Sequence, residues 1–433
     1  MTAEGRAWRW RRQEILGLYV AVIPLAVVLD RFVDMVLPGP FLGGPWQAAF
    51  IVDVFAMGLA TVLFVAYRPV EPWRGSVTAC LTTLLALWVL AVAMSTLRGS
   101  SLSATAFLVP LGVAMAALKR PSPWSLWVAA DAFAWALALT SVAALALEVS
   151  GAVPSWYDVQ AREEPGLAAG ERNEYWLPLA DLFGLAGRWA GPFGHPSLAG
   201  PVGAFLVVYA LVRRGPTRMV LSVVGVLLLL LAGSRASMLS ALVAALVWIG
   251  AEAGRRISRR GVWILGLAGV IVLASSIVAL VGRNPGLSGR TSIWPEYASL
   301  WRESPLLGVG ATRIWDAIES GALPMWASHG HNMWLDALTR TGLVGFSVLL
   351  ALMVQAFLIA LAAARSGEGA GLALLALVIF GTLADTVIDW RYAAPTSVVL
   401  LFAILLSGSK VSAAAPPESR SAAVPPEADV GSG

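Results

Sequence analysis

The sequence predicts an all-α polytopic membrane protein with about twelve transmembrane helices and a large external loop. Of its 433 residues, 58% are hydrophobic and only 13% are charged, whereas soluble domains carry about 25% charged residues. The apolar residues lie in long runs, and a helix of about 20 apolar residues crosses a bilayer. This composition excludes a soluble enzyme and a disordered chain. With Cys80 as its one cysteine, it also excludes a disulfide scaffold.

Three groups of apolar segments, within 15–149, 196–282 and 331–408, predict the spans. The last group opens with a segment too long for one perpendicular crossing, so we expect it to begin outside the membrane or to tilt. The predicted spans are 15–37, 47–67, 77–97, 102–118, 125–149, 196–212, 217–232, 236–251, 262–282, 331–364, 370–388 and 395–407.

Basic residues indicate the orientation of these spans. Positively charged residues concentrate in cytoplasmic connections, and the N-terminal segment 1–14 is rich in arginine. Every second connection after it is also basic, so we expect both ends of the chain to be cytoplasmic. Residues 409–433, rich in Ala, Pro, Ser and Glu, predict a disordered tail. The net charge of +4 therefore indicates cytoplasmic loops rather than a nucleic-acid surface, and we expect no nucleic-acid partner.

Two long segments lie on the external side. Residues 150–195 are acidic, whereas residues 283–330 are rich in tryptophan. Indole rings favour the membrane interface, so we expect the second segment to fold against the membrane. Its tryptophans are Trp294, Trp301, Trp315 and Trp326.

Three arginines fall at outer span ends, where the orientation rule disfavours them: Arg188, Arg235 and Arg290. A guanidinium is always charged and fits phosphate oxygens with two parallel hydrogen bonds. Converging arginines at the outer leaflet would therefore suit a lipid-linked diphosphate. The alternative is that each anchors a helix end or pairs with an acidic residue. That structural interpretation is favoured for the other outer arginines, Arg98, Arg302, Arg313, Arg340 and Arg391, of which Arg340 follows Asp336 by four residues and predicts a helical ion pair.

His331 is the candidate proton acceptor. It stands where the second loop re-enters the membrane, and we expect it to be exposed. Histidine takes up a proton near neutral pH, which suits a general base acting on a sugar hydroxyl. The alternative is a helix-capping or interfacial histidine. His195 either shapes the entry into its span or hydrogen-bonds substrate.

Metal and cofactor motifs are absent from the sequence. His329 and His331 could form half of a metal site, but no cysteine or acidic cluster lies beside them. There is no G-x-S-x-G elbow, Walker loop, dinucleotide glycine fingerprint or D-x-D pair. We therefore expect no metal and no cofactor, with arginine as the charge partner of any diphosphate.

Four motifs resemble the O-antigen ligase/polymerase superfamily of bacterial envelope glycosyltransferases. Arg188-Trp-Ala-Gly-Pro-Phe-Gly-His-Pro-Ser-Leu-Ala199 resembles its R-x-x-G-x-F-x-H-P-N motif, and Ser234-Arg-Ala236 its Ser-Arg turn. Gly289-Arg-Thr-Ser-Ile-Trp294 and Ser304-Pro-Leu-Leu-Gly-Val-Gly310 resemble the start of its large periplasmic loop. His331-Asn332 with Gly342-Leu-Val-Gly345 resembles the end of that loop. The sequence departs from the family at Ser197, usually asparagine, and in its acidic first loop.

The resemblance implies a GT-C-like, metal-independent enzyme of the bacterial cytoplasmic (inner) membrane with its active site facing the periplasm. Its donor would be a glycan linked to undecaprenyl diphosphate, and its acceptor a lipid or another glycan. Arg188, Arg235 and Arg290 would bind the diphosphate, and His331 would activate the acceptor hydroxyl. His195, Ser234, Asn332 and Trp294 are further candidate substrate contacts.

Competing interpretations remain open. Ligases transfer the glycan to the lipid-A core of lipopolysaccharide, polymerases to another lipid-linked repeat, and some relatives to a protein hydroxyl. A transporter or flippase for a lipid-linked glycan is a different class, and it would place its polar sites near mid-membrane. The spans carry few charges there, with Asp131 and Asp385 as the main exceptions, which favours an outer-face enzyme. Both aspartates are candidate helix–helix hydrogen-bonding groups.

Overall fold

The computed structural model describes residues 11–36, 45–69, 72–97, 108–153, 183, 188–193, 196–213, 215, 217–253, 290–324, 327, 330–384 and 395–413. Within these ranges every regular element is helical, which confirms the predicted all-α class. The predicted span 262–282, His195, Asp385 and most of the acidic segment 150–195 lie outside the described residues.

The helices follow the apolar segments closely. The first group comprises α2 (Tyr19–Val36), α3 (Pro45–Ala66), α4 (Gly75–Leu97), α5 (Leu108–Leu118) and α6 (Pro123–Val149). The second comprises α10 (Pro196–Val212), α11 (Arg218–Ala232) and α12 (Arg235–Ala253), and the third α16 (Met333–Arg365), α17 (Ala370–Ala384) and α18 (Pro395–Ala413). Two helices of the second external segment, α14 (Arg290–Glu303) and α15 (Gly310–Glu319), stand apart from these groups.

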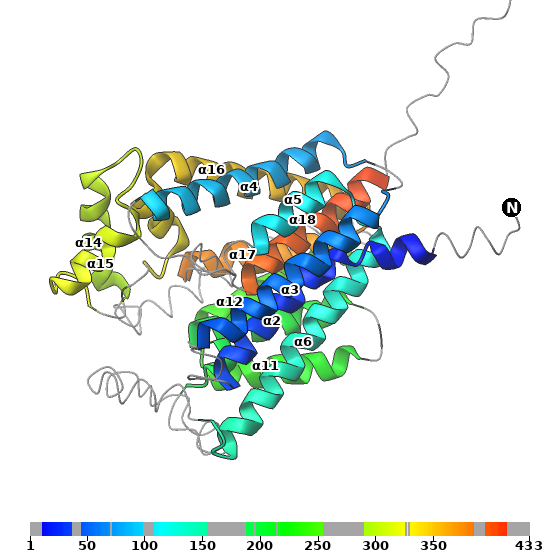
Figure 1. The fold of residues 1–433 in the computed structure, drawn as a ribbon, viewed down its shortest axis with the longest axis horizontal. Coiled ribbons are helices and arrows are strands. Elements are labelled where there is room, and N and C mark those ends of the chain that lie inside the picture. The colour runs from blue at the N-terminus through cyan, green and yellow to red at the C-terminus, as the bar shows by residue number, and fades with distance from the viewer. Residues whose placement is uncertain are drawn as a thin grey trace, which may run out of the picture.

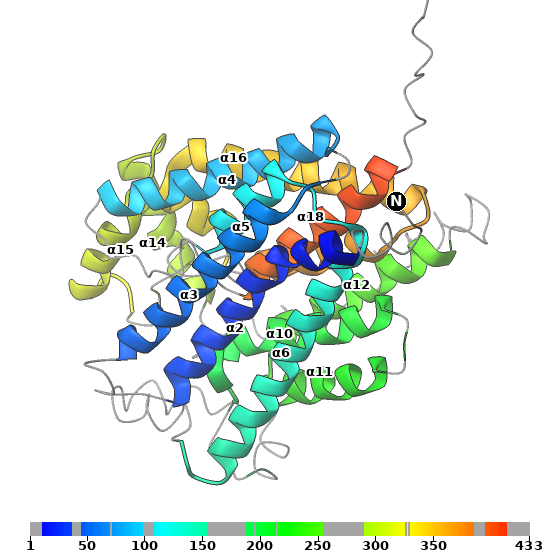
Figure 2. The same ribbon diagram turned by 45° about the vertical axis from the view of Figure 1, so that its right-hand side comes forward.

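The spans pack as one bundle around α18 (Figures 1 and 2). Residues 398–406 of α18 are buried throughout. Phe402 stacks obliquely on Phe133 of α6, which in turn contacts Phe205 of α10, with ring centroids 5.8 and 5.4 Å apart. Helix α4 lies beside α16, far away in the sequence. The core is therefore built from all three helix groups.

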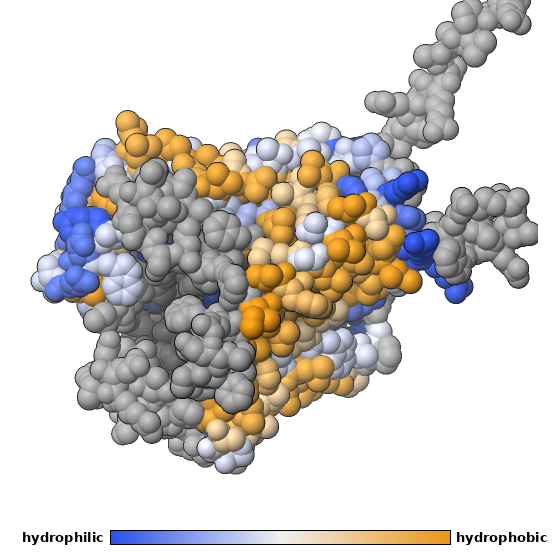
Figure 3. Space-filling view, in the orientation of Figure 1, coloured by the Kyte–Doolittle hydropathy of each residue, from blue (hydrophilic) through white to orange (hydrophobic). Residues whose placement is uncertain are grey.

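The surface has the polarity of a membrane protein. Figure 3 shows apolar residues over the middle of one face and hydrophilic residues at its two ends. Large apolar side chains on the outside of the bundle, such as Phe55, Val62 and Val223, are exposed, which in water would be costly over so large an area. Four helices of the described residues are long and apolar enough to cross a membrane: Arg11–Val33, Pro123–Val149, Arg235–Ala253 and Met333–Arg365. The protein is thus an integral membrane protein, whereas the full set of twelve spans and the GT-C-like arrangement stay predictions.

Connections predicted to share the cytoplasmic side lie together at one end of the bundle. Lys119 donates to the carbonyl groups of Phe64 and Tyr67, at 2.6 and 2.9 Å, and so caps the end of α3. Arg120 donates to the Ser409 carbonyl at 2.9 Å and stacks over Trp73. These basic side chains neutralise the partial negative charge of helix C-termini. The positive residues thus have structural partners as well as a topological role.

The long predicted span 331–364 corresponds to helix α16, which is broken near its start. Gly342 has φ 64° and ψ −166°, so the helix breaks there. Before Gly342, the Thr339 hydroxyl donates to the Tyr297 carbonyl of α14 at 3.1 Å. After it, Gln355 accepts from the Thr83 hydroxyl of α4 at 3.2 Å. The predicted span 331–364 is therefore divided into a short first part and a longer second part, and its start outside the membrane stays a prediction.

Candidate functional site

The turn between α11 and α12, which the sequence predicts to lie on the outer side, places Arg235. Gly233 ends α11 in the left-handed conformation (φ 56°), with its N–H bonded to the Leu229 carbonyl at 3.1 Å. The Ser234 hydroxyl then lies 2.8 Å from that of Ser237 and accepts a hydrogen bond from its N–H at 3.4 Å. Ser234 thus caps α12, and Arg235 becomes the first residue of that helix, at its electropositive end.

Arg188 joins the same turn from a distant part of the chain. Its Nε donates to the Ala232 carbonyl at 2.8 Å, and the neighbouring Trp189 N–H donates to the Leu231 carbonyl at 2.9 Å. The segment beside it forms a short 3-10 helix, η3 (Gly191–Phe193), which packs on α2, α6 and α10. Arg188 is therefore joined to the turn that precedes Arg235, as the hypothesis of a shared diphosphate site requires.

The start of α10 presses against this turn. A Cβ added to Gly200 would lie 2.4 Å from the Ser234 Cβ and 2.7 Å from the Ser237 Oγ. Only glycine permits this approach. The contact fixes the N-terminus of α10, which follows the R-x-x-G-x-F-x-H-P segment, next to Ser234 and Arg235.

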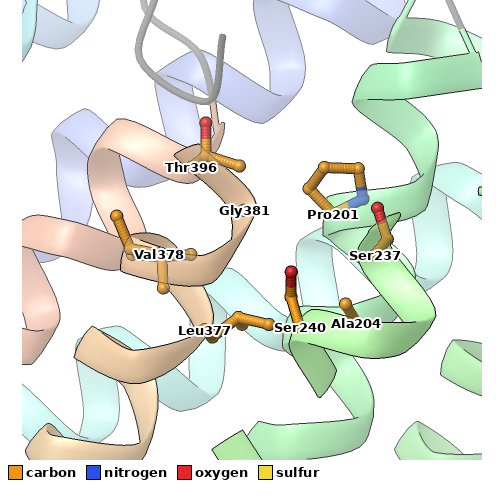
Figure 4. Close-up of a pocket in the computed structure, with 9 residues that line it drawn as sticks. Pro201, Ala204, Ser237, Ser240, Leu377, Val378, Gly381 and Thr396 are labelled. Carbon is orange, nitrogen blue, oxygen red and sulfur yellow. The ribbon is translucent and has the colours of Figure 1, made fainter. Parts of the chain in front are cut away.

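A narrow pocket continues from this turn into the bundle. Figure 4 shows the hydroxyl groups of Ser237 and Ser240 on α12 across from α17 and the beginning of α18. The pocket has room for about one water molecule, so it is too small to hold a substrate. Its lining residues are Pro201, Ala204, Ser237, Ser240, Leu377, Val378, Gly381, Thr396 and Val399.

The second external segment is a small folded unit with its own core. Ile293, Tyr297 and Leu300 of α14 are buried against Ile314 and Ile318 of α15. The Tyr297 hydroxyl donates to the Ala327 carbonyl at 2.8 Å. This unit, the α14–α15 subdomain, lies at one end of the bundle beside the start of α16 (Figure 1).

His331 sits where the subdomain joins α16. It is the one non-glycine residue with positive φ (46°) among the described residues, and its side chain is buried, with the residue 6% exposed. The expectation of an exposed histidine is therefore wrong. Burial results because the chain on either side is held down: Trp294 Nε1 donates to the Gly330 carbonyl at 3.0 Å, and Asn332 begins α16.

Asn332, rather than His331, caps α16. Its Oδ1 accepts from the N–H groups of Trp334 and Leu335 at 3.0 and 3.1 Å. The alternative of His331 as the capping residue is thereby removed. The contact of Asn332 with substrate stays a prediction, as does that of Trp294.

Asp336 forms hydrogen bonds with the backbone on both sides of His331. Its Oδ1 accepts from the Gly330 N–H at 3.0 Å, and its own N–H donates to the Asn332 carbonyl at 2.9 Å. Its Oδ2 forms the predicted ion pair with Arg340 at 2.9 Å, with side-chain exposures of 3% and 8%. Asp336 therefore holds both neighbours of His331 and is itself held by a buried cation. We call these contacts the Asp336 clamp.

One contact links the two halves of the site. Trp334, three residues after His331, donates from Nε1 to the Thr382 hydroxyl of α17 at 3.1 Å. Helix α17 packs against α12, and Gly381 lines the pocket that Ser237 also lines. The His331 side and the Arg235 side thus border the same end of α17.

Some of the other predicted site residues lie outside the described residues. Arg290 is the first residue of α14, but its side chain lies outside the described residues, as do His195 and His329. Arg313 forms a two-pronged pair with Glu303 at 2.9 and 3.0 Å, which raises the pKa of Arg313 through these hydrogen bonds. This structural role agrees with the interpretation favoured from sequence.

Within the predicted spans of 15–149, the structure shows the surroundings of three aspartates, one half-buried and two buried. Asp131 of α6 accepts from Arg213 at 2.8 and 3.0 Å and from the Tyr209 hydroxyl at 2.6 Å. It therefore links α6 to the end of α10, as the helix–helix hypothesis predicts. Asp30 of α2 and Asp53 of α3 are 2% and 1% exposed. Asp30 and Asp53 are thus further carboxylates within the predicted spans 15–37 and 47–67, in addition to Asp131 and Asp385.

Comparison with known proteins agrees with these motifs. Residues 220–350 match the family model described as O-antigen ligase. A stretch of 105 residues is 31% identical to the exopolysaccharide production protein ExoQ of Rhizobium meliloti (strain 1021), covering 21% of this chain and 24% of that protein. The match thus spans about a quarter of that relative's length. Residues 220–350 are thus similar to O-antigen ligases, which supports the superfamily that the motifs between Ser234 and Gly345 resemble.

Proposed function

We propose that this protein is a membrane glycosyltransferase of the O-antigen ligase type. It would transfer a glycan from undecaprenyl diphosphate to an acceptor hydroxyl at the outer face of the bacterial cytoplasmic membrane. The observation that carries the proposal is the meeting of Arg188 and Arg235 at one outer turn, within or beside the family-matched segment. Arg188, whose Nε is held by the Ala232 carbonyl, and Arg235, the first residue of α12, place two cations near the same turn, which would suit a lipid-linked anion.

The arginines would act on the leaving group. In the displacement, the acceptor oxygen forms a bond to the anomeric carbon while the bond from that carbon to the diphosphate oxygen breaks. Negative charge builds on the departing diphosphate, so fixed cations favour the transition state more than the ground state. Arg235 at the start of α12 adds the positive end of the helix dipole. Attack from the face opposite the leaving group inverts the anomeric centre.

His331 would receive the acceptor proton on its imidazole ring. Because the residue is only 6% exposed, its burial would shield the proton transfer from bulk water, which otherwise competes as acceptor. The Asp336 clamp would keep the ring in one position, because a misplaced base loses much of its rate advantage. Asp336 and Arg340 are thus positioning residues in this proposal, and His331 the catalytic residue.

A polymerase of the same superfamily is the second candidate. It is favoured by the similarity to a protein named for exopolysaccharide production. In that case the acceptor would be a hydroxyl of another lipid-linked repeat unit. Both activities use the same donor chemistry, so they differ only in the acceptor site.

Product analysis separates these candidates. Purified protein would be supplied with an undecaprenyl-diphosphate-linked oligosaccharide, with and without a second acceptor, and products would be resolved by gel and mass spectrometry. A ladder of longer lipid-linked glycans indicates a polymerase, and single transfer that requires the second acceptor indicates a ligase. Arg235→Ala should abolish transfer, whereas the matched control Arg313→Ala, in a surface ion pair, should retain it. No carrier release with any lipid, glycan or protein acceptor would refute the proposal and favour a transporter.

A further inference from the structure

Four exposed apolar side chains gather at the base of the α14–α15 subdomain. Leu306 and Leu307 are 64% and 51% exposed, and Leu343 and Val344 are each 42% exposed. Residues 304–309 between the two subdomain helices contain no charged side chain. We call these four residues the apolar wedge. Exposed leucines this close together are unusual on a surface that faces water.

Backbone hydrogen bonds hold the two parts of the wedge together. The Leu343 N–H donates to the Pro305 carbonyl at 2.9 Å, and the Val344 N–H donates to the Leu306 carbonyl at 3.2 Å. These are the N–H groups that the break at Gly342 frees from the helix. The carbonyl groups of Pro305 and Leu306 therefore accept the hydrogen bonds that carbonyl groups of a continuous α16 would accept.

The turn is rigid as well as exposed. The Pro305 carbonyl also accepts from Trp301 Nε1 at 3.1 Å, and the Gly308 N–H donates to the Ser304 carbonyl at 2.8 Å. A Cβ on Gly308 would lie 2.4 Å from the Arg340 carbonyl carbon, and one on Gly342 would lie 2.3 Å from that of Leu306. Such close backbone packing leaves the wedge little freedom to turn its leucines inward.

The wedge continues the outward face of α16. Leu343, Leu350, Val354 and Phe357 are 42–49% exposed, and their spacing places them on one side of the helix. Along the edge formed by α16 and α4, apolar surface extends to the α14–α15 end of the molecule (Figure 3). The occupant of the α16 face in an integral membrane protein is lipid, and Leu343, the first residue of that side of the helix, is itself part of the wedge.

We propose that the apolar wedge inserts among the lipid acyl chains of the leaflet next to the α14–α15 subdomain. The inserted wedge would hold the subdomain against the membrane and fix the distance of the subdomain from the bilayer centre. Trp301, beside the turn, is the residue type that marks the interface. Gly308 packs on the backbone at Arg340. The depth of the wedge in the membrane would therefore also set the depth of the Asp336 clamp and of His331. The docking does not depend on the proposed glycosyl transfer, although it would place that site at headgroup level.

Single-cysteine labelling tests the insertion. Cys80 is buried and is the one cysteine of the chain, so Cys80→Ala gives a clean background. Spin labels would be placed at Leu306→Cys or Leu307→Cys, with Val354→Cys as the lipid control and Glu319→Cys, exposed at the end of α15, as the water control. Each full-length variant would be reconstituted at low density in phosphatidylcholine–phosphatidylglycerol vesicles. Collision rates with oxygen and with a water-soluble nickel chelate would then be measured.

The wedge labels should resemble the Val354 label, with an oxygen-to-nickel collision ratio several-fold above that at Glu319. A ratio equal to that at Glu319 would overturn the proposal, because the wedge would then face water. Spectral broadening between labels at 306, relieved by dilution with unlabelled protein, would overturn it in favour of a second copy of the chain. The leucines are exposed, so cysteine at these positions leaves the core intact, and monodisperse elution of each variant checks this.

Discussion

The Asp336 clamp makes a quantitative prediction, because its ion pair is nearly inaccessible to solvent. Asp336 and Arg340 have side-chain exposures of 3% and 8% at a separation of 2.9 Å. Removing one partner of such a pair leaves a buried charge and costs about 3–5 kcal/mol. Arg340→Gln alone should therefore lower the folding equilibrium constant by roughly 10² to 4 × 10³-fold, since about 1.4 kcal/mol is one power of ten.

The double variant Asp336→Asn, Arg340→Gln should regain most of that loss. Both side chains are then neutral, and the asparagine Oδ1 can still accept from the Gly330 N–H. Thermal stability of the two single variants and the double variant in one detergent gives the coupling between them. Single-variant losses that simply add would refute the ion pair as the element that holds the clamp.

Activity adds a readout that a purely structural role would not move. Asp336→Ala removes the acceptor for the Gly330 N–H, so transfer turnover should fall while donor KM stays nearly unchanged. Asp336→Asn in the Arg340→Gln background keeps that acceptor and should restore turnover. Equal turnover for the alanine and asparagine forms, compared at matched folded fractions, would show that Asp336 does not position His331.

Three further changes test the local geometry by thermal stability in detergent. Gly342→Ala should destabilise by more than the ~1–3 kcal/mol cost of a backbone conformation (φ 64°, ψ −166°) that essentially only glycine adopts, because its Cβ would also meet the Leu306 backbone. Wild-type stability would contradict the hydrogen-bonded break in α16. Asn332→Ala should cost about 1 kcal/mol as a lost N-cap, with Asn332→Asp as the variant that keeps the cap. Arg213→Gln should destabilise by leaving Asp131 without its cation, and Asp131→Asn added to it should recover part of the loss; no recovery would mean that this pair does not link α6 and α10.

The helices were predictable because each is encoded by a local apolar run. Segment 196–212 coincides with α10, and the segment 395–407 lies within the slightly longer α18. The alternation of basic connections likewise predicted which ends meet, as the contact of Arg120 with Ser409 shows. Composition and periodicity are sufficient for such features, since they depend only on neighbouring residues.

The site was predictable in its residues but less so in its environment. The motif around Ser234 and Arg235 identified the outer turn, and the spacing of Asp336 and Arg340 predicted their ion pair. The burial of His331 was not predictable, because it depends on tertiary contacts of the α14–α15 subdomain with the start of α16, such as that of Trp294 with the Gly330 carbonyl. The contact between Trp334 and Thr382 has no local signal for the same reason.

The most direct test of the proposed mechanism compares His331→Ala with wild type in donor binding and in donor turnover. Purified protein in vesicles would receive an undecaprenyl-diphosphate-linked oligosaccharide with acceptor, and release of undecaprenyl diphosphate would be followed alongside donor affinity. We predict that His331→Ala keeps donor affinity within a few-fold and loses at least 10²-fold in turnover, in keeping with the range for general-base catalysis. Turnover equal to wild type, or loss of donor affinity with turnover retained at saturation, would contradict the assignment of His331 as the proton acceptor.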